Sequence, residues 1–257
     1  MPNLLQRVIR KLADINFYKN LPRTVGELVK RTYHEKILFK VASKESVFTS
    51  IWKNNYWSDN ESVSGPGSTL AYTENIRKEL PSLFERYNIK SVFDAPCGDF
   101  TWMKEVLKDS PLNYMGGDIV KGIVDRNNEV NETDKIRFIV FDITTQQFPK
   151  SDLWLCRDVF FHLSYKDIVS ALKQFVASDI PYFLTTTHFN PDRFANTDIL
   201  TGDFRLIDLF KSPYNFPHDV LHRFEDYIEP HPPREMCLFT REQISQLVNK
   251  LPQAFPQ

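Results

Sequence analysis

Three aspartates each follow a short apolar run in the middle of the sequence. They are Asp94, Asp118 and Asp142, and successive members are 24 residues apart. The runs alternate with helical patterns, which predicts a parallel sheet whose strands end in carboxylates. Ligands of such sheets bind at the carboxyl ends of the strands, near the point where the strand order reverses. A carboxylate after the second strand can accept hydrogen bonds from a ribose, so we expect Asp118 to bind a nucleoside.

The turn after the first run, from Asp94 to Phe100, indicates which nucleoside this is. It holds one glycine, Gly98, where the fingerprint of a dinucleotide site has three. Asp94 and Asp99 would repel a pyrophosphate, but they suit a ligand with a cationic amino-acid end and no phosphate. S-adenosylmethionine has this chemistry, because it combines an ammonium, a sulfonium, a ribose and an adenine. The alternative for Asp99 is that it only caps a helix that starts near Thr101.

Methyl transfer from such a ligand requires an acceptor held in line with the methyl group and, if the acceptor is a hydroxyl, a base. The candidate bases are Asp158, His162 and His188, because each follows a strand on the ligand side. His162 titrates in the useful range and lies one turn from Asp158 if that segment is helical. The alternative is that His162 is a packed residue at the start of the next helix.

At these residues the sequence resembles the class I S-adenosylmethionine-dependent methyltransferases. Segment 94–100 is similar to motif I of that family, Asp118 stands where the ribose-binding acid falls, and 141–143 stands where the adenine-contacting acid falls. Segment 156–163 resembles the motif after the fourth strand, and the likeness covers about residues 89–187. The resemblance implies S-adenosylmethionine as the cofactor. The expected cofactor-binding residues are Asp94, Ala95, Cys97, Gly98, Phe100, Trp102, Asp118, Ile119, Asp142, Ile143, Arg157 and Ser68.

Three further segments, 64–68, 201–205 and 215–217, resemble a bacterial subgroup whose members often occur with glycan-assembly enzymes. This association favours a sugar acceptor, so we expect O-methylation of a glycan or another small hydroxyl compound. The acceptor is expected to bind to the loop of about 188–219 through Arg205, Asp203, Tyr214 and Phe216. The alternatives are N-methylation, methylation of a macromolecule, and a non-catalytic Rossmann-type binding module.

The elements that must position these residues follow from the hydrophobic pattern. Strands are expected at 91–94, 113–118, 136–142, 152–157 and 182–186, and an antiparallel pair at 220–224 and 236–239. Helices are expected at 4–15, 24–39, 69–80 (ending before Pro81) and 164–178. The predicted fold is α/β, a Rossmann-like sheet with helices on both faces and an N-terminal helical extension. The domain boundary is placed between residues 62 and 63, and Ser64–Ser68 is predicted to fold over the cofactor as a lid.

Composition sets the remaining expectations. The 257 residues carry a net charge of −1, so no global attraction to nucleic acid is expected. The first 53 residues hold 11 Lys and Arg against 4 Asp and Glu, so this segment is either a solvated helical face or a contact for a membrane surface, a nucleic acid or an acidic protein partner. Three widely spaced cysteines and irregularly spaced histidines predict no disulfide and no metal site.

No apolar run is long enough to span a bilayer, and a cytoplasmic location is expected. The pattern does not predict an oligomeric state.

Overall fold

A computed structural model describes residues 38–57 and 59–256 of the chain. The expected helix at 4–15 lies outside the described residues, as does most of the one at 24–39. Described residues before the sheet form α4 (Phe39–Val41), α5 (Lys44–Lys53), a 3₁₀ turn, η2 (Pro66–Ser68), and α6 (Glu74–Arg86). No helix of the described residues combines the length and apolar character needed to cross a membrane.

The core of the molecule is a seven-stranded sheet with the order β3-β2-β1-β4-β5-β7-β6. Its strands are β1 (Ser91–Asp94), β2 (Asn113–Asp118), β3 (Ile136–Val140), β4 (Leu153–Cys156), β5 (Tyr182–His188), β6 (His222–Glu225) and β7 (Arg234–Thr240). The first five strands are parallel, and β7 pairs antiparallel with both β5 and β6. The strand order reverses between β1 and β4, and a ligand site is expected at this point in a sheet of this kind. The predicted strands and the late antiparallel pair are confirmed.

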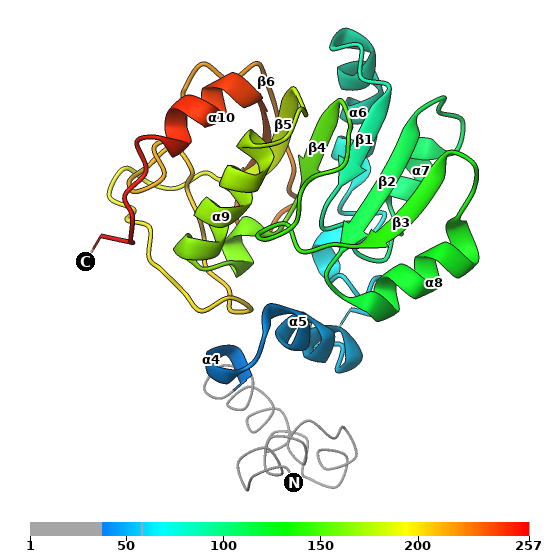
Figure 1. The fold of residues 1–257 in the computed structure, drawn as a ribbon, viewed down its shortest axis with the longest axis horizontal. Coiled ribbons are helices and arrows are strands. Elements are labelled where there is room, and N and C mark those ends of the chain that lie inside the picture. The colour runs from blue at the N-terminus through cyan, green and yellow to red at the C-terminus, as the bar shows by residue number, and fades with distance from the viewer. Residues whose placement is uncertain (1–37, 58, 257) are drawn as a thin grey trace, which may run out of the picture.

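Alternating side chains of the strands pack against helices on both faces of the sheet (Figure 1). Phe93, Trp154 and Phe183 lie in one core cluster with α9 (Tyr165–Val176) and α10 (Arg241–Val248). Val92 and Leu155 lie in the other, with α6 (Glu74–Arg86) and α7 (Met103–Leu107). The remaining helical segments are α8 (Lys121–Asn131), which contacts β2 and β3, and η3 (Phe160–His162). The predicted α/β fold class is therefore confirmed.

Helix α6 differs from the expectation that it would end before Pro81. It runs to Arg86, with Pro81 inside it. Its apolar face explains the continuation, because Leu80, Leu83 and Phe84 are all buried in the core at helical spacing. Burial of Leu83 and Phe84 outweighs the hydrogen bond that Pro81 cannot donate.

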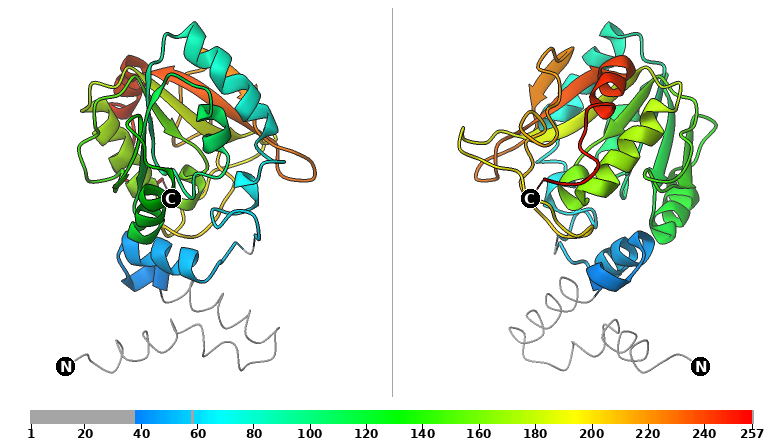
Figure 2. Two further views of the ribbon diagram at one scale, coloured as in Figure 1. Left: turned by 90° about the vertical axis from the view of Figure 1, so that its right-hand side faces the viewer. Right: turned by 60° about the vertical axis from the view of Figure 1, so that its left-hand side comes forward.

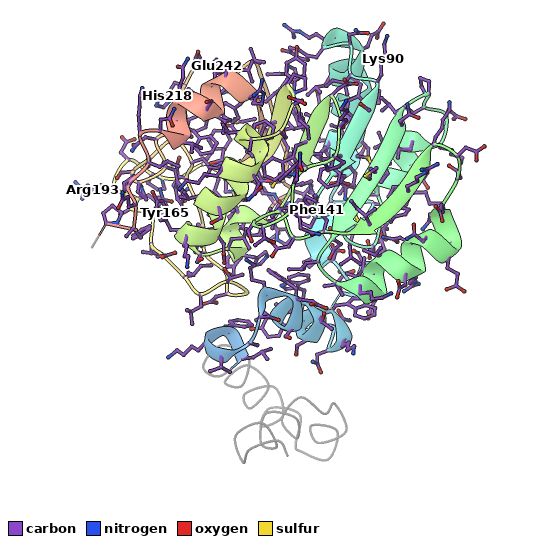
Figure 3. All side chains as sticks on the ribbon, in the orientation of Figure 1. Lys90, Phe141, Tyr165, Arg193, His218 and Glu242 are labelled. Atoms are coloured by element: carbon purple, nitrogen blue, oxygen red, sulfur yellow. The ribbon has the colours of Figure 1, made fainter. Side chains whose placement is uncertain are left out.

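The carboxyl ends of the parallel strands face α4 and α5. Lys90, directly before β1, lies at the upper edge in Figure 3, whereas Phe141, directly after β3, lies lower and nearer to α5. Figure 2 places α4 and α5 on that same side of the sheet in both turned views. The N-terminal part of the described chain therefore covers the edge at which the aspartates were expected.

The segment between β5 and β6 contains no regular helix or strand among its described residues, yet it is ordered by burial. Ile207, Leu209, Tyr214 and Phe216 are at most 1% exposed. Backbone hydrogen bonds from His188 to Ile207 and from Gly202 to His162 fix the segment to the end of the sheet. The loop therefore lies beside the residues that follow β4.

Candidate active site

A cavity opens between α5 and the carboxyl ends of β1, β2 and β4. It is lined by residues that follow these strands and by aromatic side chains from the N-terminal part of the described chain. The polar members come mainly from the strand ends, and the apolar members are the larger part of the wall. Lining residues include Asp94, Cys97, Gly98, Trp102, Asp118, Ile119, Asp142, Ile143, Arg157, Ser68, Phe48, Trp52 and Trp57.

The turn after β1 is shaped by Gly98. Its φ is +56°, and a Cβ at this position would lie 2.3 Å from Oγ of Ser64, so only glycine fits without rearrangement. The Gly98 amide donates to Oδ2 of Asp118 at 3.1 Å, and the Val120 amide donates to Oδ1 at 2.9 Å. These bonds join the ends of β1 and β2 and fix the direction of the Asp118 carboxylate.

Asp99 attaches the preceding loop to this turn. Its Oδ2 accepts from the Ser62 hydroxyl at 2.8 Å and from the Val63 amide at 2.9 Å, while Oγ of Ser64 accepts from the Asp99 amide at 3.0 Å. Oδ1 also accepts from the Thr101 amide at 3.3 Å. Asp99 therefore holds the loop over the turn as well as bonding to the residue where a helix was expected to start.

The two deepest carboxylates have altered acidity. Burial raises the pKa of Asp94 to about 7, although the Tyr114 hydroxyl donates to Oδ2 at 2.7 Å. Burial also raises the pKa of Asp118 to about 6, against the two amides that bind it. A cationic ligand would favour the ionised form of both carboxylates, so the site is suited to positive charge.

Asp142 is held at the outer end of the cavity. Its Oδ1 accepts from the amide and the hydroxyl of Thr144, at 2.9 and 2.7 Å. Nζ of Lys44 in α5 lies 3.4 Å from Asp142 and 3.4 Å from Asp167, so it joins α5 to the segment after β3 and to α9. Residues on both sides of the predicted domain boundary at 62/63 therefore line this cavity.

A second cavity of about 270 Å³ adjoins the first. Four residues line both cavities, namely Trp57, Ser64, Asp158 and His162. The rest of the second wall is rich in rings and includes Tyr56, Tyr72, Phe161, His188, Asp203, Phe204, His231 and Arg234. Two adjoining cavities with a shared boundary can hold two molecules that react with each other.

Asp158 stands at this boundary with its backbone in the left-handed region, at φ +58°. The Thr186 hydroxyl donates to its Oδ1 at 3.1 Å and accepts from its amide at 3.0 Å. Its Oδ2 lies 2.7 Å from Nη2 of Arg234 and 3.3 Å from Nη1 of Arg157. Burial opposes ionisation, but the two guanidinium groups outweigh it and lower the pKa of Asp158.

His162 has a defined tautomer. Its Nδ1 lies 2.9 Å from the carbonyl oxygen of Asp203, which can only accept, so Nδ1 carries the hydrogen and Nε2 has a free lone pair. Burial lowers the pKa of His162, which keeps the ring neutral near pH 7. The rings of Trp57 and Phe204 lie 5.4 and 5.7 Å from it. His162 thus has the state that a general base requires.

His188 differs from His162 in its tautomer. The Ile207 amide donates to its Nδ1 at 3.3 Å, and burial, with Arg234 nearby, lowers the pKa of His188 to about 4. The hydrogen of the neutral ring is therefore on Nε2, which makes His188 a hydrogen-bond donor at the wall of the second cavity. Among residues 38–57 and 59–256, no three His, Cys, Asp or Glu side chains are grouped as metal ligands, and the three cysteines are buried free thiols.

Comparison with solved structures identifies the fold. The N-methyltransferase NodS from Bradyrhizobium japonicum WM9, in complex with S-adenosyl-L-homocysteine, matches over 74% of this chain and 97% of its own, with a TM-score of 0.53 and 9% identity. The magnesium protoporphyrin IX methyltransferase of Synechocystis PCC 6803 matches over 84% and 99%, with a TM-score of 0.51 and 10% identity. This chain has the fold of an S-adenosylmethionine-dependent methyltransferase.

Human N-acetylserotonin methyltransferase, in complex with S-adenosylmethionine, has the same methyltransferase fold. It matches over 89% of this chain and 68% of its own, with a TM-score of 0.50 and 12% identity. No protein-family model matches the sequence, and no curated protein matches it. The likeness is therefore one of fold, and the chemistry must be argued from the site itself.

The first cavity of the methyltransferase fold brings together ten of the twelve residues predicted to bind the cofactor. Ala95 and Phe100 lie in the core instead. The Ala95 carbonyl accepts from the Trp154 indole at 2.9 Å, and the Phe100 ring packs against Tyr114 and Phe138. Neither residue is among those that line the first cavity.

The predicted acceptor residues separate into two groups. Asp203 lines the second cavity, and so do the candidate bases Asp158, His162 and His188. Arg205 does not, because its guanidinium is buried and donates to the Leu163 carbonyl and the Tyr214 hydroxyl, both at 2.7 Å. Tyr214 and Phe216 are also core residues. The Tyr214 ring packs against Tyr165 of α9 and the Phe216 ring against Phe239 of β7, so both side chains hold the loop after β5 on the core.

Several lining residues were missed at the level of sequence. Lys44 and Trp52 reach the first cavity from α5, and Tyr72 and Arg234 reach the second. Asp226, which is 1% exposed, binds Arg157 behind the boundary. A buried charge cannot be recognised from an irregular stretch of sequence, but the acidic and basic residues that flank the late strand pair were a signal that charges meet there.

Proposed function

We propose that this protein is an S-adenosylmethionine-dependent methyltransferase that methylates a hydroxyl group of a small acceptor, such as a sugar or glycan. The first cavity would hold the cofactor and the second would hold the acceptor. The observation that carries the proposal is the position of His162, a neutral imidazole whose free Nε2 belongs to a ring that lines both cavities.

The residues of the first cavity fit the cofactor by their chemistry. Asp118 would accept hydrogen bonds from the ribose hydroxyls, and Asp94 would face the ammonium group. Asp142 would lie near the adenine, with Ile119 and Ile143 among the apolar residues of the wall. The bound cofactor would supply an electrophilic methyl group on its sulfonium.

The chain's own task would be to orient the acceptor and remove its proton. Nε2 of His162 would take the proton from the attacking hydroxyl, while Nδ1 stays bonded to Asp203 and keeps the ring oriented. The rings of Trp57 and Phe204 flank His162 and offer apolar surfaces against which a sugar ring can stack. The protonated His162 would be stabilised by the neighbouring carboxylate of Asp158, whose charge raises its pKa.

Calorimetric titration with S-adenosylmethionine and with S-adenosylhomocysteine tests the cofactor assignment. Asp118→Ala should weaken binding by about 100-fold, because it removes charge-assisted hydrogen bonds to the ribose. Asp125→Ala is the matched control, since this exposed aspartate of α8 pairs only with Lys121 among the ion pairs of the described residues. Equal affinities of the two variants would overturn the ribose assignment.

A methyl-transfer screen over sugars, glycans and other small hydroxyl compounds, read by release of S-adenosylhomocysteine, tests the reaction. We expect turnover with at least one uncharged acceptor and its loss in His162→Gln. Tight binding of both cofactor forms with no turnover on any acceptor would instead identify a non-catalytic binding module.

A further inference from the structure

Asp158 is held by more contacts than a general base requires. Arg234 contacts its Oδ2 at 2.7 Å, Arg157 contacts the same oxygen at 3.3 Å, and Thr186 binds Oδ1. These three partners are each at most 8% exposed. The carboxylate is thereby fixed in position and kept ionised, so it acts as a permanent hydrogen-bond acceptor at the boundary of the two cavities.

Asp226 supports both guanidinium groups from behind. Its carboxylate accepts from Nε and Nη2 of Arg157 at 2.8 and 3.1 Å, and its carbonyl accepts from Nε of Arg234 at 2.8 Å. The Arg234 guanidinium also stacks on the Tyr72 ring, 4.6 Å from its centroid. The two positive and two negative charges balance, which allows the group to be buried.

The loop above this group is shaped to it. A Cβ on Gly67 would lie 3.0 Å from Oδ2 of Asp158 and 3.2 Å from Nη2 of Arg234. Any larger residue at this position would push against the ion pair. The Gly65-Pro66-Gly67 segment therefore covers the Asp158–Arg234 ion pair and also lines the second cavity.

Two hydrogen-bond acceptors thus line the boundary of the two cavities. Asp158 is an ionised carboxylate, and His162 presents the lone pair of Nε2. Both line both cavities, and the charge of Asp158 is close enough to raise the pKa of His162. A single hydroxyl has one hydrogen, which His162 would receive, so the remaining lone pairs of the Asp158 carboxylate are suited to a second hydroxyl of the same molecule.

We propose that the acceptor carries two adjacent hydroxyl groups, and that Asp158, held in place by Arg234, binds the hydroxyl that is not methylated. This inference rests on the proposed function, and it narrows the substrate class to vicinal diols. His162 takes the proton of the reacting hydroxyl. At the same time the hydroxyl oxygen forms the new bond to the methyl carbon, and the bond between that carbon and sulfur breaks. Arg234 is a positioning residue, because it acts on the acceptor through Asp158.

Matched pairs of acceptor probes test the inference. The probes are catechol against phenol, and methyl β-D-glucopyranoside against its 2-deoxy, 3-deoxy and 4-deoxy derivatives. We expect kcat/KM for at least one diol to exceed that for its matched compound without the neighbouring hydroxyl by about 10- to 100-fold, as for a hydrogen bond to a charged group. Equal kcat/KM within every pair that reacts would overturn the inference.

Variants separate Asp158 from the base. Asp158→Asn and Arg234→Lys should raise KM for the diol about tenfold or more and change kcat less, because they remove binding to a non-reacting group. KM for the compound with one hydroxyl should change less than KM for the diol. Asp158→Asn should also lower kcat somewhat for both compounds, because it removes the charge that stabilises protonated His162, whereas His162→Gln should lower kcat for both and keep the preference for the diol. A diol preference that survives in Asp158→Asn would contradict the inference.

The cofactor affinity of each variant provides the control. Calorimetry should give the same affinity for S-adenosylhomocysteine in Arg234→Lys and the unaltered protein, which verifies that the variant is folded. The proposed function fails by a different result, namely unaltered cofactor binding in Asp118→Ala. The two failures are therefore distinguishable.

Discussion

At the scale of single residues, the hydrogen-bond partner of each imidazole decides its role. His162 and His188 both line the second cavity and both have a lowered pKa. A carbonyl faces Nδ1 of His162, whereas an amide faces Nδ1 of His188. The first arrangement leaves a lone pair on Nε2 and the second leaves a hydrogen there. Only His162 is thereby suited to accept a proton from an acceptor.

The pH dependence of turnover should report this base. His162 must be neutral to act, so activity should fall as the pH decreases through its pKa, which burial lowers. The midpoint of the acidic limb of kcat/KM should therefore lie below 6.5, and turnover should be constant between pH 7 and 8. His162→Gln should lower kcat by about 100- to 1,000-fold without changing cofactor affinity. An acidic limb that is the same in His162→Gln would assign the base elsewhere.

Cofactor binding should release protons. The pKa of Asp94 is raised to about 7 and that of Asp118 to about 6, so both are partly protonated at pH 6.5. A cationic ligand favours the ionised carboxylates, so affinity should increase from pH 5.5 to 8. Calorimetry at pH 6.5 in phosphate and in Tris should give different heats, because the released proton is taken up by the buffer. Asp94→Asn should reduce this difference, and equal heats in both buffers would contradict the assignment.

The sequence predicts the parts of the site that follow strands and misses those that come from elsewhere. Asp94, Asp118 and Asp142 could be found because short apolar runs between helical segments mark where each strand ends. Asp226 and Arg234 could not be found in this way, since their roles depend on an ion-pair network between segments that are distant along the chain. Arg205 was expected at the acceptor, but its buried guanidinium binds the Leu163 carbonyl and the Tyr214 hydroxyl, which are partners that the sequence pattern does not reveal.

At the scale of elements, α6 illustrates how packing overrides a local signal. Proline is a strong helix breaker in a sequence pattern, yet Pro81 is inside α6 because the apolar face continues beyond it. The predicted helix at 69–80 was wrong at both ends, because α6 begins at Glu74 and ends at Arg86. The loop after β5 is a second case, since its buried residues follow neither helical nor strand periodicity.

Replacement of Pro81 should stabilise the protein. The residue is exposed, so alanine loses little packing, and it restores an amide that can donate to the Arg77 carbonyl. We expect Pro81→Ala to raise the free energy of unfolding by about 1–2 kcal/mol, as measured by urea denaturation, after allowing for the greater freedom of the unfolded chain. Ser82→Ala, at the next exposed position, is the control. A decrease in stability would mean that the proline ring itself is needed in α6.

The contact between α5 and α8 should affect cofactor affinity and stability differently. A Cβ on Gly122 would lie 2.4 Å from Cη2 of Trp52, whose ring lines the first cavity. Alanine within a helix is normally stabilising by about 1 kcal/mol, but Gly122→Ala must displace this ring. We expect cofactor affinity to fall about fivefold while the secondary structure is retained. Glu129→Ala, on the exposed face of α8, should leave affinity unchanged, and equal affinities in both variants would show that Trp52 is not needed for binding.

At the scale of the whole molecule, the strand order places all the chemistry at one edge of the sheet. The parallel sheet and the antiparallel final pair were predictable, because short apolar runs alternate with helical segments along the chain. The strand order β3-β2-β1-β4-β5-β7-β6 was not predicted and comes from the structure. The covering of that edge by α4 and α5 (Figure 1) was not predictable, since the expected boundary at 62/63 rested on the change of pattern after Ser62.

Helix α5 contacts residues of both cavities. Trp52 and Phe48 face the first cavity, and Val47 lies where a Cβ of Gly202 would come within 2.4 Å of it. The Gly202 amide donates a hydrogen bond to the His162 carbonyl, and Gly202 precedes Asp203 and Phe204 of the second cavity. Helix α5 thus lines the first cavity and packs against Gly202 in the wall of the second.

This double contact of α5 implies an ordered sequence of binding in steady-state kinetics. The donor should bind first and its demethylated product should leave last, because α5 is expected to hold the Gly202 side of the second cavity in place only when the donor is bound beneath Trp52 and Phe48. Initial-rate measurements should then find the product competitive with the donor and noncompetitive with the acceptor. Random entry, with either reactant binding the free protein equally well, would mean that the two chambers work independently.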